Sequence, residues 1–340
     1  MSITDKELCF GVIGCGSMAG KVHCPNLATI PGTRLAAYCD LDEAKAQKLL
    51  AAHGGDYVTT HADRILCDRN LDAVLIQVSP EVHPRLVQEA ALAGKHIFVE
   101  KPLAVMLPDA VETVRAVQAA KVKFIIGLCN RLAPHVRRAK RICPKPLYSF
   151  CQCSDTVTHQ ACHNLDLAVN LFHDPALASV YASGGQHWNL DPHLPADSFS
   201  AVLTFADGSV HTYLQHGKAY NALLKKYHFQ LFGRDGCVYL AKRFKECHYM
   251  KTPAAVEQSW IFEGNDMDRG PNGYMGHWDE LRELVDCIRS GRGNGTMTVR
   301  DGAYVLAVEK AILRSVETKQ VVDFPAFLRE QKAEMLIGKA

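Results

Sequence analysis

The first 126 residues alternate between strand-like and helix-like patterns, and this rhythm constrains the fold more than any other feature of the sequence. Short apolar runs indicate buried strands over 8–14, 33–39, 57–60, 72–78, 96–100 and 123–128. Helical periodicity occupies most of the intervals, over 17–30, 42–53, 81–94 and 106–120. Strands that alternate with helices form βαβ units, whose crossover connections produce a parallel sheet. We therefore predict an α/β, doubly wound parallel sheet over 1–126.

The pattern changes after residue 130, where hairpin-like pairs of strands and separate helices replace the regular alternation. Two hairpins are predicted, at FSAVLTFADGSVHTYLQH and YHFQLFGRDGCVYLAK, each with a glycine-containing turn. Helices are predicted at 163–172 and in the segments HWDELRELVDCIRS and GAYVLAVEKAILRSVE. Runs of strands with helices at their ends indicate an α+β domain on a mostly antiparallel sheet. We assign this second domain to 127–340.

The composition excludes several classes of protein. Hydrophobic residues make up 48% of the 340 residues, enough for a large core. With 38 Lys and Arg against 36 Asp and Glu, the net charge of +2 gives no electrostatic basis for binding nucleic acid or an anionic membrane. The 13 cysteines follow no disulfide spacing, and the sequence shows neither a signal peptide nor a stretch as long as a membrane span. We expect a cytoplasmic protein with no nucleic-acid or membrane partner.

A glycine-rich turn, FGVIGCGSMAGK, joins the first predicted strand to the first predicted helix. Gly14 and Gly16 have the G-x-G spacing, and Ala19 stands at the third position, where the motif permits alanine. The first glycine allows a tight turn, and the second lets the phosphates of a dinucleotide approach the N–H groups of the helix. With Ser17 and Met18, this turn is a candidate cofactor site, although a purely structural turn has the same pattern.

Asp40 strengthens the cofactor interpretation. It ends the second predicted strand, about twenty residues after the turn, where dinucleotide-binding domains place an acidic residue. Its carboxylate can accept from both hydroxyls of a ribose, and it would repel a 2′-phosphate. No Arg or Lys follows before Lys45. We therefore predict NAD in preference to NADP.

Together with these motifs, the segments LDAVLIQVSPEVHPRLVQEAALAGKHIFVEKPLA and GLCNR resemble the glucose–fructose oxidoreductase/inositol dehydrogenase/MocA (Gfo/Idh/MocA) family. The resemblance is strong up to residue 131 and looser afterwards. It implies a Rossmann domain and a C-terminal domain on a large open sheet, which binds substrate and often mediates oligomerisation. It also implies NAD(P)-dependent chemistry on the CH–OH groups of sugars and cyclitols, and we expect a homo-oligomer, a dimer or a tetramer.

The tripeptide Glu100–Lys101–Pro102 follows the fifth predicted strand, at the end of a parallel strand, where α/β sheets bind ligands. In the family that the chain resembles, this tripeptide lies beside the nicotinamide, and its proline bond is usually cis. By that match Lys101 is the catalytic lysine and contacts cofactor and substrate, while Glu100 positions the cofactor or holds the amine. The alternative interpretation is a surface ion pair at a strand end.

Four further positions match the family's cofactor site. Ser79 and Pro80 correspond to the turn after the fourth strand, His83 to the histidine of the next helix, and Asn130 to the crossover between domains. For His83, a capping or packing role fits the pattern at least as well as contact with the cofactor.

The stretch HQACHNLD corresponds to Asp-x-Gly-x-His-x-x-Asp, a motif that is common in polyol dehydrogenases of the family. His163 and Asp166 match the last His and Asp, whereas His159 replaces the leading Asp. The resemblance implies that these three residues bind substrate, with neutral His163 as base, His159 as a second catalytic group and Lys101 as orienter or proton relay. The alternatives are a helix-entry cap for His163 and a loop histidine for His159.

Two aromatic residues are candidate substrate contacts, Trp188 in QHWNLDPHLPADSF and Tyr274 in GYMGHW. An aromatic surface with polar neighbours suits a sugar ring, although packing is the commoner role of such residues.

A metal site is a rival interpretation of a cluster of thiols and imidazoles in the second domain, at Cys151, Cys153, His159, Cys162 and His163. The C-x-C spacing is not that of zinc ligands. Cys151 and Cys153 alternate along the strand that the segment LYSFCQCSD predicts, so both can be small buried residues on one face. We predict no metal.

Three functions are consistent with these features. The favoured one is an NAD-dependent oxidoreductase of a sugar, sugar derivative or cyclitol, in which Lys101 and His163 handle the proton. The second is an NAD-dependent glycosidase that acts by transient oxidation and elimination, and the third is a non-catalytic NAD-binding regulator.

Overall fold

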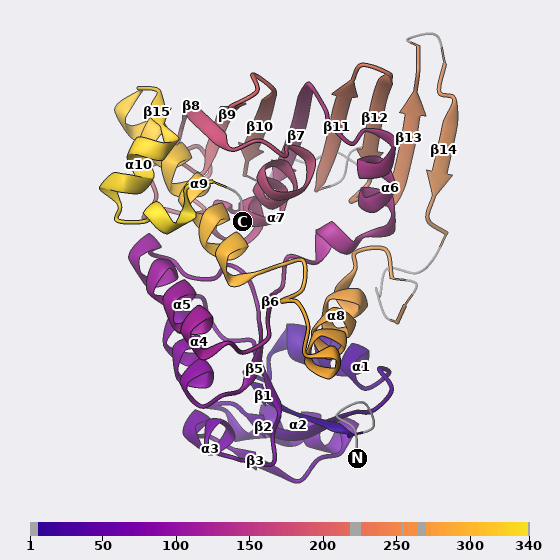
Figure 1. Ribbon diagram of the computed structural model, residues 1–340, viewed down its shortest axis with the longest axis vertical. Helices are drawn as coiled ribbons and strands as arrows, with labels where there is room; N and C mark the ends of the chain where they lie inside the picture. Colours follow the sequence, from indigo (N-terminus) through magenta and orange to yellow (C-terminus); the bar gives the residue numbers. More distant parts are fainter. Residues whose placement is uncertain (1–5, 218–225, 253–254, 264–269, 272, 339–340) are drawn as a thin grey trace. The chain divides into compact units, whose positions relative to one another are not determined.

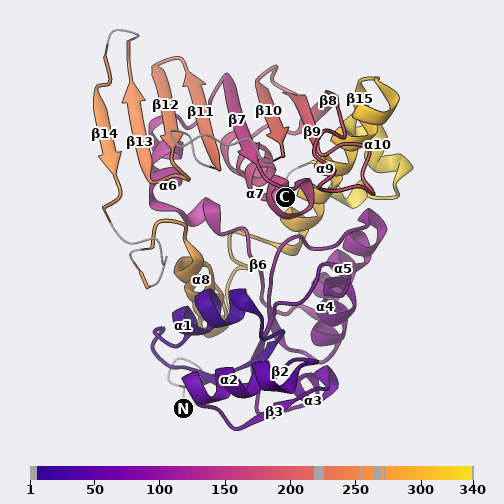
Figure 2. The same cartoon turned by 180° about the vertical axis from the view of Figure 1, so that it is seen from behind.

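The computed structural model describes residues 6–217, 226–252, 255–263, 270–271 and 273–338 (Figures 1 and 2). The chain divides into two compact units, Met1–Cys129 with Asn265–Ala303, and Asn130–Gly264 with Tyr304–Ala340. The first unit therefore includes a late segment of the chain that the predicted division at 126/127 assigns to the second domain.

The first unit is built on a six-stranded parallel sheet in the order β3-β2-β1-β4-β5-β6. Its strands are β1 (Leu8–Ile13), β2 (Thr33–Cys39), β3 (Tyr57–Thr59), β4 (Ala73–Ile76), β5 (His96–Val99) and β6 (Phe124–Ile126). All four residues of β4 are fully buried, as expected for a strand covered on both faces. The strand order reverses between β1 and β4, and open α/β sheets bind ligands at the carboxyl ends of the strands beside such a reversal. The predicted doubly wound parallel sheet is confirmed.

Helices pack beside this sheet, and capping residues and prolines explain where several of them begin. They are α2 (Glu43–His53), α3 (Ala62–Leu66), α4 (His83–Leu92), α5 (Leu107–Ala120) and α8 (His277–Ser290). Asp42 caps α2 by accepting from the N–H of Ala44, and prolines stand in the first turns of α4 and α5, where a missing N–H costs nothing. Helix α8, late in the sequence, packs against α1 and β6 in this unit.

The first helix after the glycine-rich turn is irregular. In place of one helix over 17–30, a π-helical turn η2 (Ala19–His23) leads into a short α1 (Cys24–Leu27). Pro25 has no N–H to donate to the preceding turn, so the helix changes its hydrogen-bonding pattern just before it. The helix is thus interrupted at Pro25, and His23 lies at the end of a widened turn.

The second unit is built on a nine-stranded sheet in the order β14-β13-β12-β11-β7-β10-β9-β8-β15. Its strands are β7 (Tyr148–Ser154), β8 (Leu177–Gly185), β9 (Ser198–Phe205), β10 (Val210–His216), β11 (Tyr227–Gly233), β12 (Gly236–Ala241), β13 (Glu246–Met250), β14 (Gln258–Ile261) and β15 (Val322–Asp323). Only β7 and β10 pair in parallel, so the sheet is mostly antiparallel, as predicted. The two predicted hairpins are β9–β10 and β11–β12.

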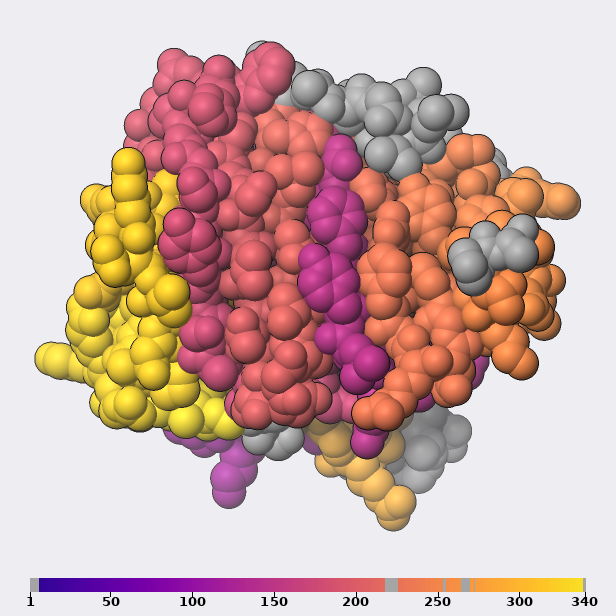
Figure 3. All heavy atoms as spheres, turned by 90° about the horizontal axis from the view of Figure 1, so that it is seen from above, coloured from indigo at the N-terminus to yellow at the C-terminus, as the bar shows by residue number. Residues whose placement is uncertain are grey.

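Seen in Figure 3, side chains of this sheet form a broad surface, on which β7 is the magenta stripe between β10 and β11. Large apolar side chains on its strands are exposed, among them Tyr148, Tyr181 and Val202. On the helical side, α6 (Pro134–Ile142) packs against β12 and β13.

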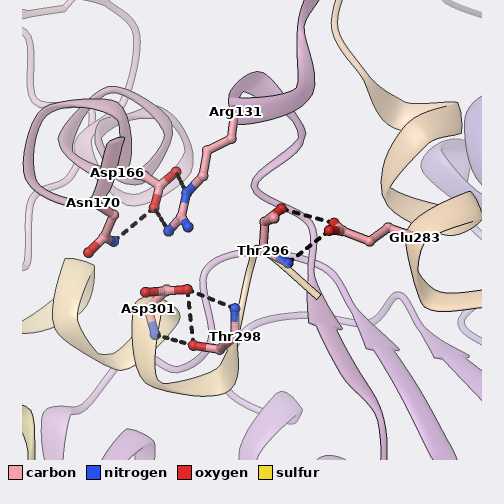
Figure 4. Close-up of polar contacts among 7 residues, drawn as sticks. All are labelled: Arg131, Asp166, Asn170, Glu283, Thr296, Thr298 and Asp301. Atoms are coloured by element: carbon pink, nitrogen blue, oxygen red, sulfur yellow. Dashed lines mark hydrogen bonds and ion pairs between the residues drawn. The ribbon is translucent and has the colours of Figure 1, made fainter. Parts of the chain in front are cut away.

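The remaining helices of the chain are η3 (Cys129–Leu132), η4 (Val157–Ala161), α7 (Cys162–Asp166), η5 (Leu167–Phe172), α9 (Val299–Thr318), α10 (Phe324–Glu330) and η6 (Glu334–Leu336). Figure 4 shows how α9 begins. The N–H of Asp301 donates to Thr298 Oγ1, and the Asp301 carboxylate accepts in return from the N–H and hydroxyl of Thr298. This reciprocal cap satisfies N–H groups that the first turn of a helix leaves unpaired. In the same view, Thr296 donates twice to Glu283 of α8.

Candidate functional site

The glycine-rich turn fits a dinucleotide, because its two glycines meet different constraints. Gly14 has φ +93°, and a Cβ there would lie 2.3 Å from the carbonyl oxygen of Gln77. The N–H of Gly14 donates to the Cys39 carbonyl, so the turn is tied to the end of β2. Gly16, by contrast, is exposed, and a Cβ there would meet nothing within 4 Å. Gly14 is therefore required by the backbone, and Gly16 leaves open space in front of the helix, where a phosphate can approach.

Asp40 follows β2 directly, and its carboxylate is held in a fixed orientation. One oxygen accepts from the N–H of Cys15 in the glycine-rich turn at 2.8 Å, and the other accepts from the N–H of Asp42 at 2.9 Å. Each oxygen has a second lone pair, so the carboxylate keeps the capacity to accept from ribose hydroxyls.

A pocket of about 720 Å³ in the first unit brings Gly14, Gly16, Asp40 and Ser79 together. Such a volume is in the range of small-molecule and cofactor sites. Residues that the sequence analysis did not propose also line it, including Lys45, His61, Gln77, Val82 and Arg85. These residues lie near the strand ends, on segments beside the glycine-rich turn. They belong to no sequence motif from which their place in the pocket could have been predicted. Other predicted cofactor residues are not among its lining residues, namely Ser17, Met18, Pro80, His83, Glu100, Lys101 and Asn130.

The Glu100–Lys101–Pro102 turn follows β5, at the carboxyl edge of the same sheet. Its Lys101–Pro102 peptide bond is cis, as the resemblance implies. The Pro102 carbonyl lies 2.8 Å from Nδ1 of His83, and the His83 side chain is fully buried. Burial lowers the pKa of His83, against the effect of this hydrogen bond, so the ring is neutral and donates to the carbonyl. His83 therefore supports the turn, in line with the packing role considered for it.

Glu100 is buried, and its carboxylate joins the turn to the first helix. Oε2 accepts from the N–H of Lys101 at 3.1 Å, and Oε1 lies 2.6 Å from Nε2 of His23. Burial opposes ionisation of Glu100, but the hydrogen bond from His23 and the positive charge of Lys101 favour it, and the Glu100 pKa is lowered overall. The pKa of His23 is also lowered, because its burial outweighs the attraction of Glu100. At neutral pH an ionised Glu100 therefore accepts from a neutral His23 ring.

In the second unit, the predicted substrate residues lie on the continuous helical segment formed by η4, α7 and η5. His163 and Asp166 are buried, whereas His159 is exposed. Figure 4 shows Asp166 between Arg131 and Asn170. Arg131 Nε donates to Asp166 Oδ2 at 2.7 Å, Arg131 Nη2 donates to Oδ1, and Asn170 donates to Oδ1 at 2.9 Å. Asp166 thus forms a bidentate buried ion pair, and substrate binding by this residue stays a prediction.

Asp191 positions the start of that helical segment, and the sequence analysis missed it. Its carboxylate accepts from the N–H of Val157 at 2.9 Å and from the Thr158 hydroxyl at 2.7 Å. It therefore serves as a cap although it lies more than thirty residues further along the chain. No local spacing signals such a partner.

The two aromatic candidates have different surroundings. Trp188 is 44% exposed, and its backbone N–H donates to the buried carboxylate of Asp197 at 2.8 Å. Tyr274 is buried, in the late segment of the first unit. Contact of either residue with substrate stays a prediction.

The predicted burial of the C-x-C cysteines is confirmed, since Cys151 and Cys153 are both fully buried in β7. In the described part of the chain, no three His, Cys, Asp or Glu side chains are grouped so as to hold a metal ion. Among the described residues, the helices also include none with both the length and the apolar character to cross a membrane.

Comparison with known families gives matches to both units. Residues 8–128 match the Gfo/Idh/MocA model described as an oxidoreductase family with an NAD-binding Rossmann fold, and residues 152–324 match the C-terminal α/β domain of the same family. The chain belongs to this family. It is therefore an oxidoreductase-family protein with an NAD-binding Rossmann domain, as the sequence analysis predicts.

Relatives of this Gfo/Idh/MocA protein include enzymes named for inositol. It is 24% identical to the myo-inositol 2-dehydrogenase of Thermotoga maritima, over 92% of this chain and 97% of the relative. It is 33% identical to the uncharacterized oxidoreductase YrbE of Bacillus subtilis, but over only 40% of each chain. A match to an inositol 2-dehydrogenase of Rhizobium meliloti likewise covers 39% of each chain.

Solved structures share the fold. An oxidoreductase from Agrobacterium radiobacter in complex with NAD+, L-tartaric acid and magnesium has a TM-score of 0.81 at 18% identity, covering 95% of this chain and 100% of the other. The WlbA dehydrogenase from Bordetella pertussis, in complex with NADH and UDP-GlcNAcA, has a TM-score of 0.75 at 22% identity, covering 94% and 98%.

Proposed function

We propose that the protein is an NAD-dependent oxidoreductase that transfers a hydride between a CH–OH carbon of a cyclitol or sugar derivative and nicotinamide. The observation that carries this proposal is the pocket that joins Gly14, Gly16 and Asp40 on the sheet edge where β5 ends in Glu100–Lys101–Pro102. Relatives named as inositol 2-dehydrogenases support a cyclitol or related polyol as substrate.

The residues of the pocket support NAD in preference to NADP. The glycine-rich turn would hold the pyrophosphate and Asp40 the adenosine ribose, beside which a 2′-phosphate would be repelled. Two cationic residues also line the pocket, Lys45 and Arg85. The guanidinium of Arg85, however, donates to both carboxylate oxygens of Glu89, at 3.0 and 2.9 Å, which reduces its attraction for a phosphate.

The chemistry requires a proton acceptor. When bound, NAD supplies the acceptor for the hydride, and the hydroxyl proton of the substrate must leave to a base within hydrogen-bond reach. We assign His163 as that base and Lys101 as the group that orients the hydroxyl or relays its proton, with His159 as a second titratable group. The family motif supports these roles, and the replacement of its leading Asp by His159 is the main departure from it.

Substitution of Lys101 tests this function. In Lys101→Ala we expect kcat to fall by at least about 100-fold, because a positioned acid–base group typically contributes 10²–10⁴-fold. The Kd for NAD should change by less than about 3-fold, since the turn and Asp40 are untouched. Sugars, sugar acids, glycosides and cyclitols would be screened by NADH fluorescence, with NAD binding measured by calorimetry.

The matched control is Lys48→Ala, which removes an exposed lysine from α2. It should retain wild-type turnover. Full activity in Lys101→Ala would refute the proposal.

Product analysis of the same reactions distinguishes the other two functions. Release of free sugar from a glycoside without net NADH, together with solvent deuterium next to the oxidised carbon, would identify a glycosidase. NAD binding without consumption of any substrate would identify a regulator.

The open face of the nine-stranded sheet is the surface on which we place the predicted homo-oligomer contact. Exposed apolar residues such as Tyr148, Tyr181 and Val202 support this placement.

A further inference from the structure

We propose that His23 is a positioning residue for catalysis, which fixes the backbone of Lys101 through Glu100. It thereby links the glycine-rich turn to the lysine that handles the substrate proton. This inference deepens the proposed function and rests on it, but it makes a structural claim that can be measured separately.

His23 ends the π-helical turn that follows the glycine-rich turn, and its side chain is fully buried. Its ring centroid lies 4.8 Å from that of Phe98 in β5, so the imidazole packs on the strand that leads to Lys101. The same ring places Nε2 at 2.6 Å from Glu100 Oε1. The widened turn before Pro25 is what brings this side chain to the end of β5.

Glu100 transmits the position of His23 to Lys101. One carboxylate oxygen faces His23, and the other accepts from the N–H of Lys101 at 3.1 Å. Gly127, just after β6, leaves space for this carboxylate, because a Cβ there would come within 3.4 Å of Oε2. Both contacts are made by this one carboxylate. Loss of the hydrogen bond to His23 would therefore weaken the contact that fixes the Lys101 backbone.

Further titratable groups surround the ring from α8. Glu280 is fully buried, with Oε1 at 3.9 Å from Nδ1 of His23, and the centroid of the His277 ring lies 5.9 Å from that of His23. Beyond it, Nε2 of His277 lies 3.4 Å from Sγ of Cys129. The groups that face His23 and Glu100 thus include Lys101 from the β5 turn, His83 from α4, and Glu280 and His277 from α8, with Cys129 next to His277.

Burial of so many ionisable groups is costly unless they are paired, and an apolar cluster of the same volume would fold at least as stably. The cluster adjoins the candidate catalytic lysine through Glu100. This position indicates a role in activity and not in stability. Such a supporting layer holds a reactive group within the narrow tolerance that catalysis requires.

The effect of pH has a defined sign. Interaction with His23 favours the ionised form of Glu100, so removal of the imidazole raises the Glu100 pKa, because the carboxyl remains buried. As the pH is lowered, Glu100 is therefore protonated at a higher pH in the variant than in the wild type. The pKa of the Glu100 carboxyl, followed by carbon-13 NMR, should therefore be higher in a variant without the imidazole than in the wild type.

The test uses two substitutions of His23 in the full-length protein. His23→Gln keeps an N–H donor near the position of Nε2, whereas His23→Leu removes it. For His23→Leu we expect kcat to fall about 10- to 100-fold, with the Kd for NAD changed less than about 3-fold and the Glu100 pKa raised. His23→Gln should recover most of kcat.

The matched control is His135→Leu in the second unit. His135 is also buried, and its Nδ1 lies 2.9 Å from the Phe244 carbonyl. This variant should have a similar cost in stability and wild-type values of kcat and of the Glu100 pKa.

A second readout is independent of turnover. In the unliganded protein, amide hydrogen exchange at Lys101 should be at least about 10-fold faster in His23→Leu than in the wild type, and close to wild type in His23→Gln and His135→Leu. If His23→Leu does not fold, Glu100→Gln replaces it, and should lower kcat and speed exchange at Lys101, because an amide has a single acceptor oxygen for the two contacts.

The inference is overturned if His23→Leu keeps wild-type kcat and wild-type exchange at Lys101, or if His23→Gln is as impaired as His23→Leu and the Glu100 pKa is unchanged. A wild-type protein that turns over none of the screened compounds would refute the proposed function instead. The exchange at Lys101 would still show whether His23 positions the turn.

Discussion

The two units hold their candidate site residues in different ways. In the first unit, Gly14, Asp40 and Lys101 each come within a few residues of the end of a parallel strand, so the sheet itself brings them to one edge. In the second unit, the helical segment that carries His159 and His163 depends on partners distant in sequence, Arg131 and Asp191. A site of the first kind can be recognised from local spacing, whereas one of the second kind requires knowledge of the tertiary structure.

The largest effect that this comparison predicts is on the stability of the second unit. Asp166→Asn leaves the guanidinium of Arg131 buried without its carboxylate, and loss of one partner of a buried pair costs about 3–5 kcal/mol. We expect a correspondingly lower free energy of unfolding in urea, monitored by circular dichroism.

The matched control for Asp166→Asn is Asp286→Asn in α8. Asp286 pairs with Arg282 at 3.0 Å on the surface, and such exposed pairs contribute about 0.3–0.5 kcal/mol. If the two variants lose the same stability, the second unit does not depend on its buried ion pair as described.

A smaller effect separates the two glycines of the cofactor turn. Gly14→Ala should cost about 2 kcal/mol or more, because φ is positive and the new Cβ would meet the Gln77 carbonyl at 2.3 Å. Gly16→Ala should change the free energy of unfolding by less than about 0.5 kcal/mol and still weaken NAD binding at least about 10-fold. Urea titration and calorimetry measure the two quantities separately.

The opposite outcome, with Gly16→Ala unstable and still able to bind NAD, would mean that the open space at Gly16 is not a phosphate site.

Much of the fold could be predicted from the sequence. All six strands of the parallel sheet lie within the predicted runs, since apolar runs between glycine and polar turns are a local signal. The hairpins β9–β10 and β11–β12 were predictable from their turns in the same way. The strands β8, β13, β14 and β15 were not predicted, because their residues alternate weakly or are too few to show a pattern, and their pairing depends on neighbours.

The residues of the candidate site likewise fall into two groups, those that local motifs predict and those that tertiary contacts place. Gly14, Gly16, Asp40 and the Glu100–Lys101–Pro102 turn carry local motifs, and the structure places them on one sheet. His23 has no such motif, because its contact with Glu100 joins residues 77 positions apart. Packing of α8 beside that contact depends in turn on a segment near the end of the chain. Contacts of this range arise from tertiary packing, which no spacing within one segment reveals.

Hydrogen exchange of the wild-type protein with and without NAD tests the central claim most directly. We predict that NAD slows amide exchange in the glycine-rich turn at residues 14–18, around Asp40, and in the Glu100–Lys101 segment, since the cofactor would lie along this edge of the sheet. Unchanged exchange in these three segments at saturating NAD would contradict the account.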